Sequence, residues 1–202
     1  MNIPFEYCAL RYLLQWERSE KELYLTLSDA PNTEQLRRAL KFFQIARNFP
    51  RLKEEGKAQF IINTLKSIKH PDEEGCTYLR VEELANCLKR EFGQYNLSAA
   101  SKLLWLRQRK PYIIYDSRAV KALKNADEVF DTRSYFEYSK AWKRQYSFHR
   151  SRIKSACERL VEIRDFFPAW YISERSMTKV VTETWFRERV FDIYLWEVGG
   201  TG

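Results

Sequence analysis

The sequence predicts an all-α protein, and three observations lead to that prediction. Apolar residues recur at intervals of three and four along almost the whole chain, which is the spacing of one face of an α-helix. The 202 residues include only six glycines and six prolines, which is few for an all-β protein with its many tight turns. The one apolar run that suits a strand, YIIY at 112–115, is too short and isolated to build a sheet. We therefore expect seven to nine helices.

The size and composition of the chain fit a folded domain. Hydrophobic residues make up 45% of the sequence and aromatic residues 15%, which is enough apolar material for a core, so disorder is not expected. We expect residues 1–202 to form a single all-α domain, either undivided or split into two helical subdomains with a cleft near 93–132. A hinge is expected at 125–132, before a long helix.

Helix-start and helix-stop residues place the elements in the first half of the chain. Thr33 is a plausible N-cap, Pro50 ends the helix that follows it, and Gly93 ends a later one. A further helix contains Lys102 and has Asn96 or Ser98 as its N-cap. Together these signals predict helices at about 4–18, 33–49, 54–70, 78–93 and 98–108.

The second half of the chain shows longer patterns. Asp116 can cap a short helix at 117–126. From about 133, apolar residues alternate in steps of four and three up to Phe167, which predicts one helix of about seven turns that Pro168 terminates. The last helix, at about 173–196, is apolar on more than one side and is therefore expected to be buried and central.

The charge and the cysteines limit the class of protein. A formal net charge of +8 suggests a polyanionic partner, with nucleic acid as the first candidate. The four cysteines form no CxxC pair and the chain has only two histidines, so we expect no metal site. We expect no organic cofactor either. Scattered cysteines, no signal peptide and no run of 18 apolar residues predict a cytoplasmic protein away from membranes. A protein partner also remains open.

A basic segment at 138–154 is the first candidate for nucleic-acid binding, because its cations suit phosphates and its aromatic rings suit exposed bases. Equally, the rings can face the core and the cations water, and the four-residue spacing of Trp142 and Tyr146 favours the core for these two. His149 lies on the same apolar side and is expected to be a packed core residue. The predicted phosphate contacts in this segment are Lys140, Lys143, Arg144, Arg150 and Arg152.

The segment SAASKLLWLRQRKPYIIYDSRAV at 98–120 is the first candidate for chemistry. An amine nucleophile must be partly desolvated to attack a carbon centre, and Lys102 lies early in a strongly apolar helix beside small residues. A carboxylate such as Asp116 can orient a nucleophile or stabilise positive charge on a sugar. Conversely, Lys102 can be a solvated lysine and Asp116 an N-cap that accepts from Arg118 or Ala119.

This segment resembles the catalytic hairpin of the helix-hairpin-helix DNA glycosylase superfamily, most nearly its 8-oxoguanine branch. In that family, a lysine-bearing helix and a proline-containing loop lead to an aspartate that begins the next helix; AASKLLWL and KPYIIYDSRAV match these parts. The resemblance implies Lys102 as the Schiff-base nucleophile, Asp116 as the carboxylate that assists base departure, and an all-α protein that flips a damaged base into a pocket. Apart from the resemblance, the cations near Lys102 and Asp116 are expected to contact phosphates, and they are Arg107, Arg109, Lys110 and Arg118.

Two other functions stay open. The glycine-containing hairpin of the glycosylase family is not evident, since FGQYNLSAAS has only Gly93. A non-catalytic nucleic-acid-binding or interaction subunit on the same helical scaffold is therefore the alternative, for instance in a bacterial defence complex. A winged-helix regulator that reads DNA with residues 78–92 is a third.

The C-terminal segment RERVFDIYLWEVG places charges inside an apolar helix. Asp192 is expected to form a structural ion pair with a buried arginine such as Arg118. Trp170 and Tyr171, after Pro168, are expected either to line a base pocket or to join the core.

Overall fold

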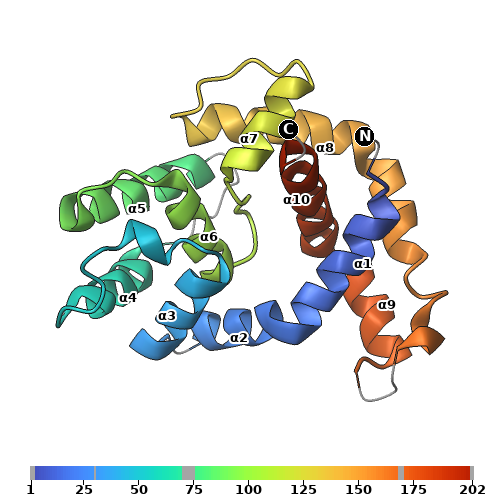
Figure 1. Ribbon diagram of the computed structural model, residues 1–202, viewed down its shortest axis with the longest axis horizontal. Coiled ribbons are helices and arrows are strands. Elements are labelled where there is room, and N and C mark those ends of the chain that lie inside the picture. The colour runs from blue at the N-terminus through green and yellow to red at the C-terminus, as the bar shows by residue number, and fades with distance from the viewer. Residues whose placement is uncertain (1–2, 30, 70–75, 168–170, 201–202) are drawn as a thin grey trace. The chain divides into compact units, whose positions relative to one another are not determined.

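A computed structural model of the chain describes residues 3–29, 31–69, 76–167 and 171–200 (Figure 1). These residues form helices and turns and contain no β-strand, which confirms the all-α prediction. If α1, the π turn that follows it and α2 are taken as one continuous helix, the described residues contain nine helices. The helices are α1 (Phe5–Gln15), α2 (Lys21–Asp29), α3 (Thr33–Phe42), α4 (Lys57–Ser67), α5 (Thr77–Phe92), α6 (Leu97–Arg107), α7 (Ser117–Asn125), α8 (Tyr135–Glu158), α9 (Glu174–Thr182) and α10 (Thr184–Gly200), with a π turn at Trp16–Glu20 and 3₁₀ turns at Ala46–Asn48 and Arg164–Phe166.

The ends of several helices follow from local hydrogen bonds. The side chain of Asn32, rather than Thr33, caps α3, and it does so in a capping box with Gln35. Gly93 ends α5 with a left-handed φ of 80°, as its sequence position predicts. Asn96 caps α6 by accepting the N–H of Ala99 at 2.8 Å.

Four helices depart from the predicted boundaries. The first helix continues through the π turn into α2, and the turn leaves Trp16 and Glu20 buried. The helix predicted at 33–49, which is α3, ends at Phe42 and not at Pro50, because Gln44 has a left-handed φ of 55° that an α-helix does not accommodate. The long helix α8 ends at Glu158. From Leu160 onward the backbone N–H groups bond three residues back, as Leu160 does to Cys157, and not four. Pro168, its predicted end, lies outside the described residues. The predicted last helix is divided into α9 and α10 by the extended backbone of Glu183, whose ψ is 137°.

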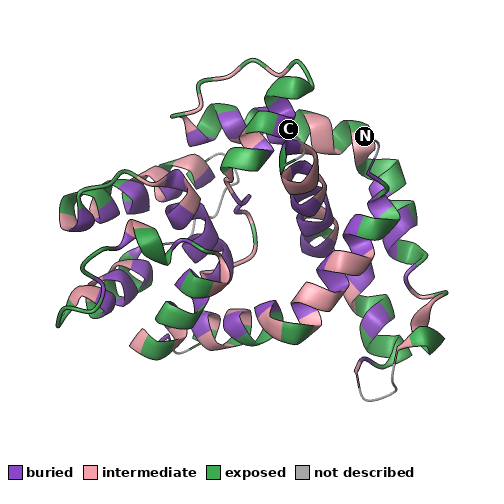
Figure 2. Ribbon diagram, in the orientation of Figure 1, coloured by how far each residue is buried: buried purple, intermediate pink, exposed green. Residues whose placement is uncertain are grey.

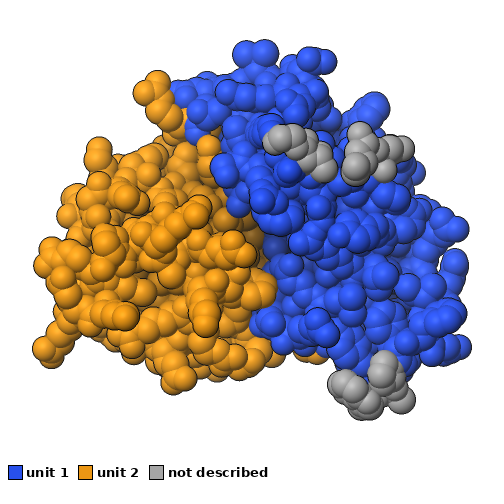
Figure 3. Space-filling model, in the orientation of Figure 1, with its two compact units in different colours: residues 1–20, 116–132, 137–202 blue, residues 21–115, 133–136 orange. Residues whose placement is uncertain are grey.

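The chain forms two compact units (Figure 3). Unit 1 comprises residues 1–20, 116–132 and 137–202, and unit 2 comprises residues 21–115 and 133–136. Each unit has a largely buried helix at its centre, which is α10 in unit 1 and α6 in unit 2 (Figure 2). In unit 1, α10 packs against α1, α7 and α9, and in unit 2, α6 packs against α2, α4 and α5.

Residues 112–115, the only predicted strand candidate, form no strand. Their backbone polar groups bond to side chains of unit 2: the Tyr135 hydroxyl accepts the N–H of Ile113 at 2.9 Å and donates to its carbonyl at 2.7 Å. Ser101 Oγ accepts the N–H of Tyr115 at 2.9 Å. Because Tyr112, Ile113 and Ile114 are buried, these bonds replace water for a segment that has no strand partner.

Candidate active site

Lys102 lies on the buried central helix of unit 2. Its side chain is only 6% exposed, because α6 is apolar on every side and is covered by its neighbours. The Lys102 amine donates a 2.9 Å hydrogen bond to Ser98 Oγ, one turn earlier on the same helix, and lies 5.9 Å from the centre of the Phe43 ring. A lysine this deeply buried is uncommon, because moving an ammonium group out of water is costly. The prediction that Lys102 is desolvated is therefore correct, and the solvated alternative is wrong.

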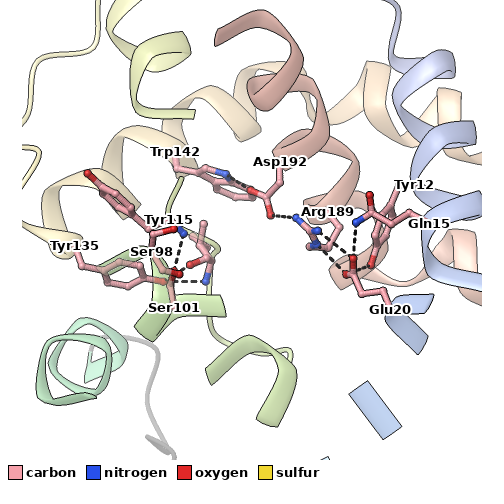
Figure 4. Close-up of polar contacts among 11 residues, drawn as sticks. Tyr12, Gln15, Glu20, Ser98, Ser101, Tyr115, Tyr135, Trp142, Arg189 and Asp192 are labelled. Carbon is pink, nitrogen blue, oxygen red and sulfur yellow. Dashed lines mark hydrogen bonds and ion pairs between the residues drawn. The ribbon is translucent and has the colours of Figure 1, made fainter. Parts of the chain in front are cut away.

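Two serines give the first turns of α6 a polar spot inside an apolar core. Ser101 is fully buried, and its hydroxyl donates to the Ser98 carbonyl at 3.3 Å while it accepts the N–H of Tyr115 (Figure 4). Ser98 holds the Lys102 amine. The residue next to Lys102 in sequence thus fixes the backbone directly before Asp116.

Asp116 is the N-cap of α7, as one of the two sequence interpretations predicts. Its Oδ1 accepts the backbone N–H of Arg118 at 3.0 Å, and its own backbone is extended. A carboxylate at a helix N-terminus is stabilised by the helix dipole. Asp116 belongs to unit 1 and Lys102 belongs to unit 2.

The N-terminal turn of α7 is held by the C-terminal end of α10. The Arg118 guanidinium lies 3.9 Å from the centre of the Trp196 ring, within the range of a cation–π contact. A Cβ atom on Gly199 would lie 1.9 Å from the Arg118 carbonyl oxygen, so only glycine allows this close approach of the two helices. The helix that Asp116 caps is therefore rigidly supported within unit 1.

Asp192 forms a structural ion pair with a buried arginine, as predicted, but Arg118 is not that arginine. Instead, Arg189 on the same helix donates to Asp192 Oδ2 at 3.0 Å and to Glu20 at 3.2 and 3.3 Å (Figure 4). The i, i+3 spacing of Arg189 and Asp192 explains why they pair. Arg118 lies on another helix, α7, and is exposed.

The buried cluster also receives neutral hydrogen bonds. Trp142 Nε1 donates to Asp192 Oδ1 at 2.8 Å, and the Tyr12 hydroxyl donates to Glu20 at 3.0 Å. Burial raises the pKa of Asp192 to about 6, although the charge of Arg189 acts in the opposite direction. For Arg189 burial would lower the pKa, but the charges of Glu20 and Asp192 outweigh it and raise the pKa above its ordinary value.

The predicted phosphate contacts in unit 2 differ in their exposure to solvent and in their contacts with the protein. The half-buried Arg107 donates from Nη1 to the carbonyl of Ser28, and the Arg109 guanidinium lies 3.7 Å from the centre of the Tyr24 ring. Lys110 is exposed. Arg107 and Arg109 therefore tie the end of α6 to α2, and Lys110 is the one of the three whose side chain is mainly in solvent.

The predicted phosphate contacts on α8 are all exposed, and they are Lys140, Lys143, Arg144, Arg150 and Arg152. Arg144 forms an ion pair with Glu128, with Nε 3.1 Å from Oε2. The hydrogen bond from Arg144 lowers the pKa of Glu128. The basic side of α8 thus faces water, and one of its cations, Arg144, is paired with the carboxylate of Glu128.

His149 packs against aromatic rings, as predicted, and Tyr171 bonds to the backbone of α1. The His149 ring is half-buried among Phe5, Phe191 and Tyr194, and burial lowers its pKa. The Tyr171 hydroxyl donates to the carbonyl of Leu14 at 3.3 Å. Trp170 lies outside the described residues.

Several residues that shape these sites carry no clear sequence signal. The pairing of Ser98 with Lys102 follows the i, i+4 spacing of a helix and could have been found. Glu20 could not, because it lies in a charged stretch, WERSEKE, and becomes buried only through the π turn. Tyr135 bonds to a segment 22 residues away, which no local pattern reveals.

The fold and these residues define an all-helical protein with a buried lysine in one unit and an exposed basic helix largely in the other. No protein-family model, curated protein or solved structure matches the chain. Within residues 3–29, 31–69, 76–167 and 171–200, no helix has both the length and the apolar character needed to cross a bilayer.

Proposed function

We propose that the chain is a DNA-binding protein that acts as a base-excision DNA glycosylase and lyase, with Lys102 as its nucleophile. The observation that carries this proposal is the burial of Lys102, 6% exposed on a central apolar helix and hydrogen-bonded to Ser98. Buried ionisable groups with a specific partner are common at functional sites, since burial is costly and is retained where the group has a task.

The resemblance to the helix-hairpin-helix glycosylases supplies the roles. The Lys102 amine forms a bond to C1′ of the deoxyribose, the C1′–N bond to the base breaks, and the base leaves with the bonding electrons. The proton that the amine loses passes to the departing base. The C1′–O4′ bond then breaks as the nitrogen lone pair forms the C=N bond, and O4′ takes up a proton from water, which gives a protonated Schiff base between Lys102 and C1′. Asp116 is assigned the stabilisation of the positive charge on the sugar.

Borohydride trapping on DNA with an abasic site or an 8-oxoguanine tests this function. Hydride reduces the Schiff base to a stable amine, so the wild-type protein should remain covalently attached to the DNA. Lys102→Met fills the buried site with an apolar side chain of similar length and should give no adduct. Lys66→Met, at an exposed lysine on α4 of the same unit, is the matched control and should trap as the wild type does.

Asp116→Asn separates catalysis from capping. Asparagine caps a helix about as well as aspartate, so the stability should be close to that of the wild type. Loss of the carboxylate charge should slow base release at least about 100-fold if Asp116 assists it. An unchanged rate in a folded Asp116→Asn variant would limit Asp116 to its role as a cap.

The second candidate is a non-catalytic nucleic-acid-binding subunit. The segment FGQYNLSAAS favours it, because it has only Gly93 where the glycosylase family has a glycine-containing hairpin. The same trapping experiment separates the two functions. No adduct on abasic or modified DNA, together with DNA binding that weakens as salt rises, would support the binding subunit and reject the enzyme.

A further inference from the structure

Phe148 is an exposed aromatic residue in the middle of the basic part of α8. Residues 138–157 contain six Lys or Arg and no Asp or Glu. Within this segment Phe148 is 79% exposed. Singly exposed apolar side chains are common on proteins, so the exposure alone carries little weight. The surroundings of Phe148 give it a specific role.

The tyrosine and tryptophan residues of the basic segment are committed to the core of unit 1, and they are Tyr138, Trp142 and Tyr146. Tyr138 is fully buried. Trp142 is 1% exposed and bonds to Asp192. Tyr146 stacks on Trp142 with ring centres 5.0 Å apart and an angle of 19°, and both rings contact Phe191 of α10. Burial raises the pKa of Tyr146 to about 12. Phe148 is therefore the aromatic residue of this segment that a partner can reach.

Helix periodicity brings polar side chains around Phe148 on the outward side of α8. Arg144 and Arg152 lie one turn before and one turn after it, Ser151 lies three residues on, and Ser147 precedes it in sequence, all of them exposed. We call these five residues the basic face of α8. Its cations and hydroxyls are groups that contact phosphates, and the serines are too short to extend past the ring.

The cations on this face and next to it differ in whether they already form an ion pair with an acidic side chain. Arg144 is paired with Glu128, and Lys154, one turn beyond Ser151, lies 3.9 Å from Glu158. Among the described residues neither Arg150 nor Arg152 forms an ion pair, and the Arg152 guanidinium rests 5.2 Å from the centre of the Phe5 ring. Arg152 can therefore contact a phosphate at no loss of an ion pair.

We propose that the basic face of α8 binds a single-stranded or locally unstacked DNA strand, with Phe148 stacked on an exposed base and Arg152 on a neighbouring phosphate. This proposal rests on the DNA binding in the proposed function and deepens it by naming the form of DNA. One flat ring among cations and hydroxyls fits a base between two phosphates. A protein partner would be matched by a larger apolar patch, and Phe148 is the one apolar side chain of this face.

Fluorescence anisotropy with a labelled single strand and the matched duplex tests the proposal. Phe148→Ala should weaken binding of the single strand by about 5- to 100-fold, since stacking on an aromatic ring contributes strongly to each bound base. It should leave the dependence on salt unchanged, because no charge is lost. Phe148→Tyr, which keeps a ring, should restore most of the affinity.

Two further variants complete the design. Arg152→Ala should weaken binding and reduce the slope of log K against log salt by about 0.7, as expected for one phosphate contact on a single strand. Phe166→Ala, at an equally exposed phenylalanine of unit 1 outside α8, is the matched control and should bind as the wild type does.

The outcomes separate this proposal from the proposed function. If Phe148→Ala binds both DNAs as tightly as the wild type, the stacking role is wrong while DNA binding and the trapping result stand. If the wild type binds no DNA but binds an acidic polypeptide such as polyglutamate, both this proposal and DNA binding are wrong. A loss confined to the single strand and to Phe148 and Arg152 variants would support the proposal.

Discussion

Lys102 and Ser98 are joined by a 2.9 Å hydrogen bond across one turn of α6, inside the core of unit 2. A hydrogen bond that replaces water for a buried polar group contributes to stability, and leaving such a group without a partner is costly. The serine hydroxyl therefore helps to hold a lysine that is 6% exposed, and the pair can be tested without any substrate.

Ser98→Ala should lower the free energy of unfolding by about 1–2 kcal/mol, because it removes the hydroxyl that accepts from the Lys102 amine. In a Lys102→Met background the same change should cost less than about 0.5 kcal/mol. Urea denaturation of the four proteins of this double-mutant cycle measures the difference. Equal costs in both backgrounds would show that the bond contributes nothing to stability.

Lys102→Met itself should be as stable as the wild type or more stable. An apolar side chain of similar length removes the cost of desolvating an amine while it keeps the packing of α6. Thermal unfolding followed by circular dichroism measures this, with Lys66→Met as the exposed control. A large loss of stability in Lys102→Met would indicate that the lysine serves the fold, and would weaken the case for catalysis.

Tyr135→Phe should destabilise unit 2 by about 1–3 kcal/mol, because the N–H and the carbonyl of the buried Ile113 would both lose their partner. Tyr95→Phe, at an exposed tyrosine of the same unit, should change stability by less than about 0.5 kcal/mol. Denaturant unfolding of the two variants measures both effects. If the two variants are equally stable, the Tyr135 bonds do not hold the 112–115 segment.

The fold was largely predictable, because it depends on local patterns. Apolar spacing and caps indicated α5, α6 and α7 to within about two residues of their observed ends. The patterns were less informative at Glu183, where one extended residue divides a helical pattern into α9 and α10. They were also less informative after Glu158, where apolar spacing continues although the backbone turns.

The candidate site was predictable where it depends on neighbours in sequence and not where it depends on distant residues. The apolar surroundings of Lys102 and the capping role of Asp116 follow from residues within one or two turns. The partner of Asp192 was predictable in the same way, because Arg189 lies three residues before it on one predicted helix, whereas Arg118 lies on another. Glu20 and Tyr135 reach their partners through tertiary packing alone.

Gly199→Ala should destabilise unit 1 by about 1–3 kcal/mol, because the new methyl group would meet the Arg118 carbonyl oxygen at 1.9 Å and force α10 away from α7. Gly200→Ala is the control, since its nearest neighbour is the flexible end of the Arg118 side chain at 2.9 Å. Its stability should stay within about 0.5 kcal/mol of the wild type. Comparable melting temperatures for the two variants would contradict the close approach of the two helices.

The contribution of Asp192 to the free energy of unfolding should increase as the pH falls from about 6 to about 4. Burial raises its pKa to about 6 in the folded protein, above the ordinary value near 4 of the unfolded chain, so the folded state takes up a proton first. Its contribution is therefore fully present below about pH 4 and is lost as the pH rises through about 6. The stability of the wild type relative to Asp192→Asn should increase by on the order of 2 kcal/mol between pH 7 and pH 4.

Nuclear magnetic resonance gives a direct measurement of the same titration. Trp142 Nε1 donates to Asp192 Oδ1 at 2.8 Å, so its indole N–H signal should shift with a midpoint near the pKa of about 6. The shift should be absent in Asp192→Asn, and the Trp196 signal, which comes from a ring under Arg118, serves as the internal control. A Trp142 signal that stays constant between about pH 4.5 and 7.5 would show that Asp192 keeps its charge throughout, held by Arg189 more strongly than burial opposes it.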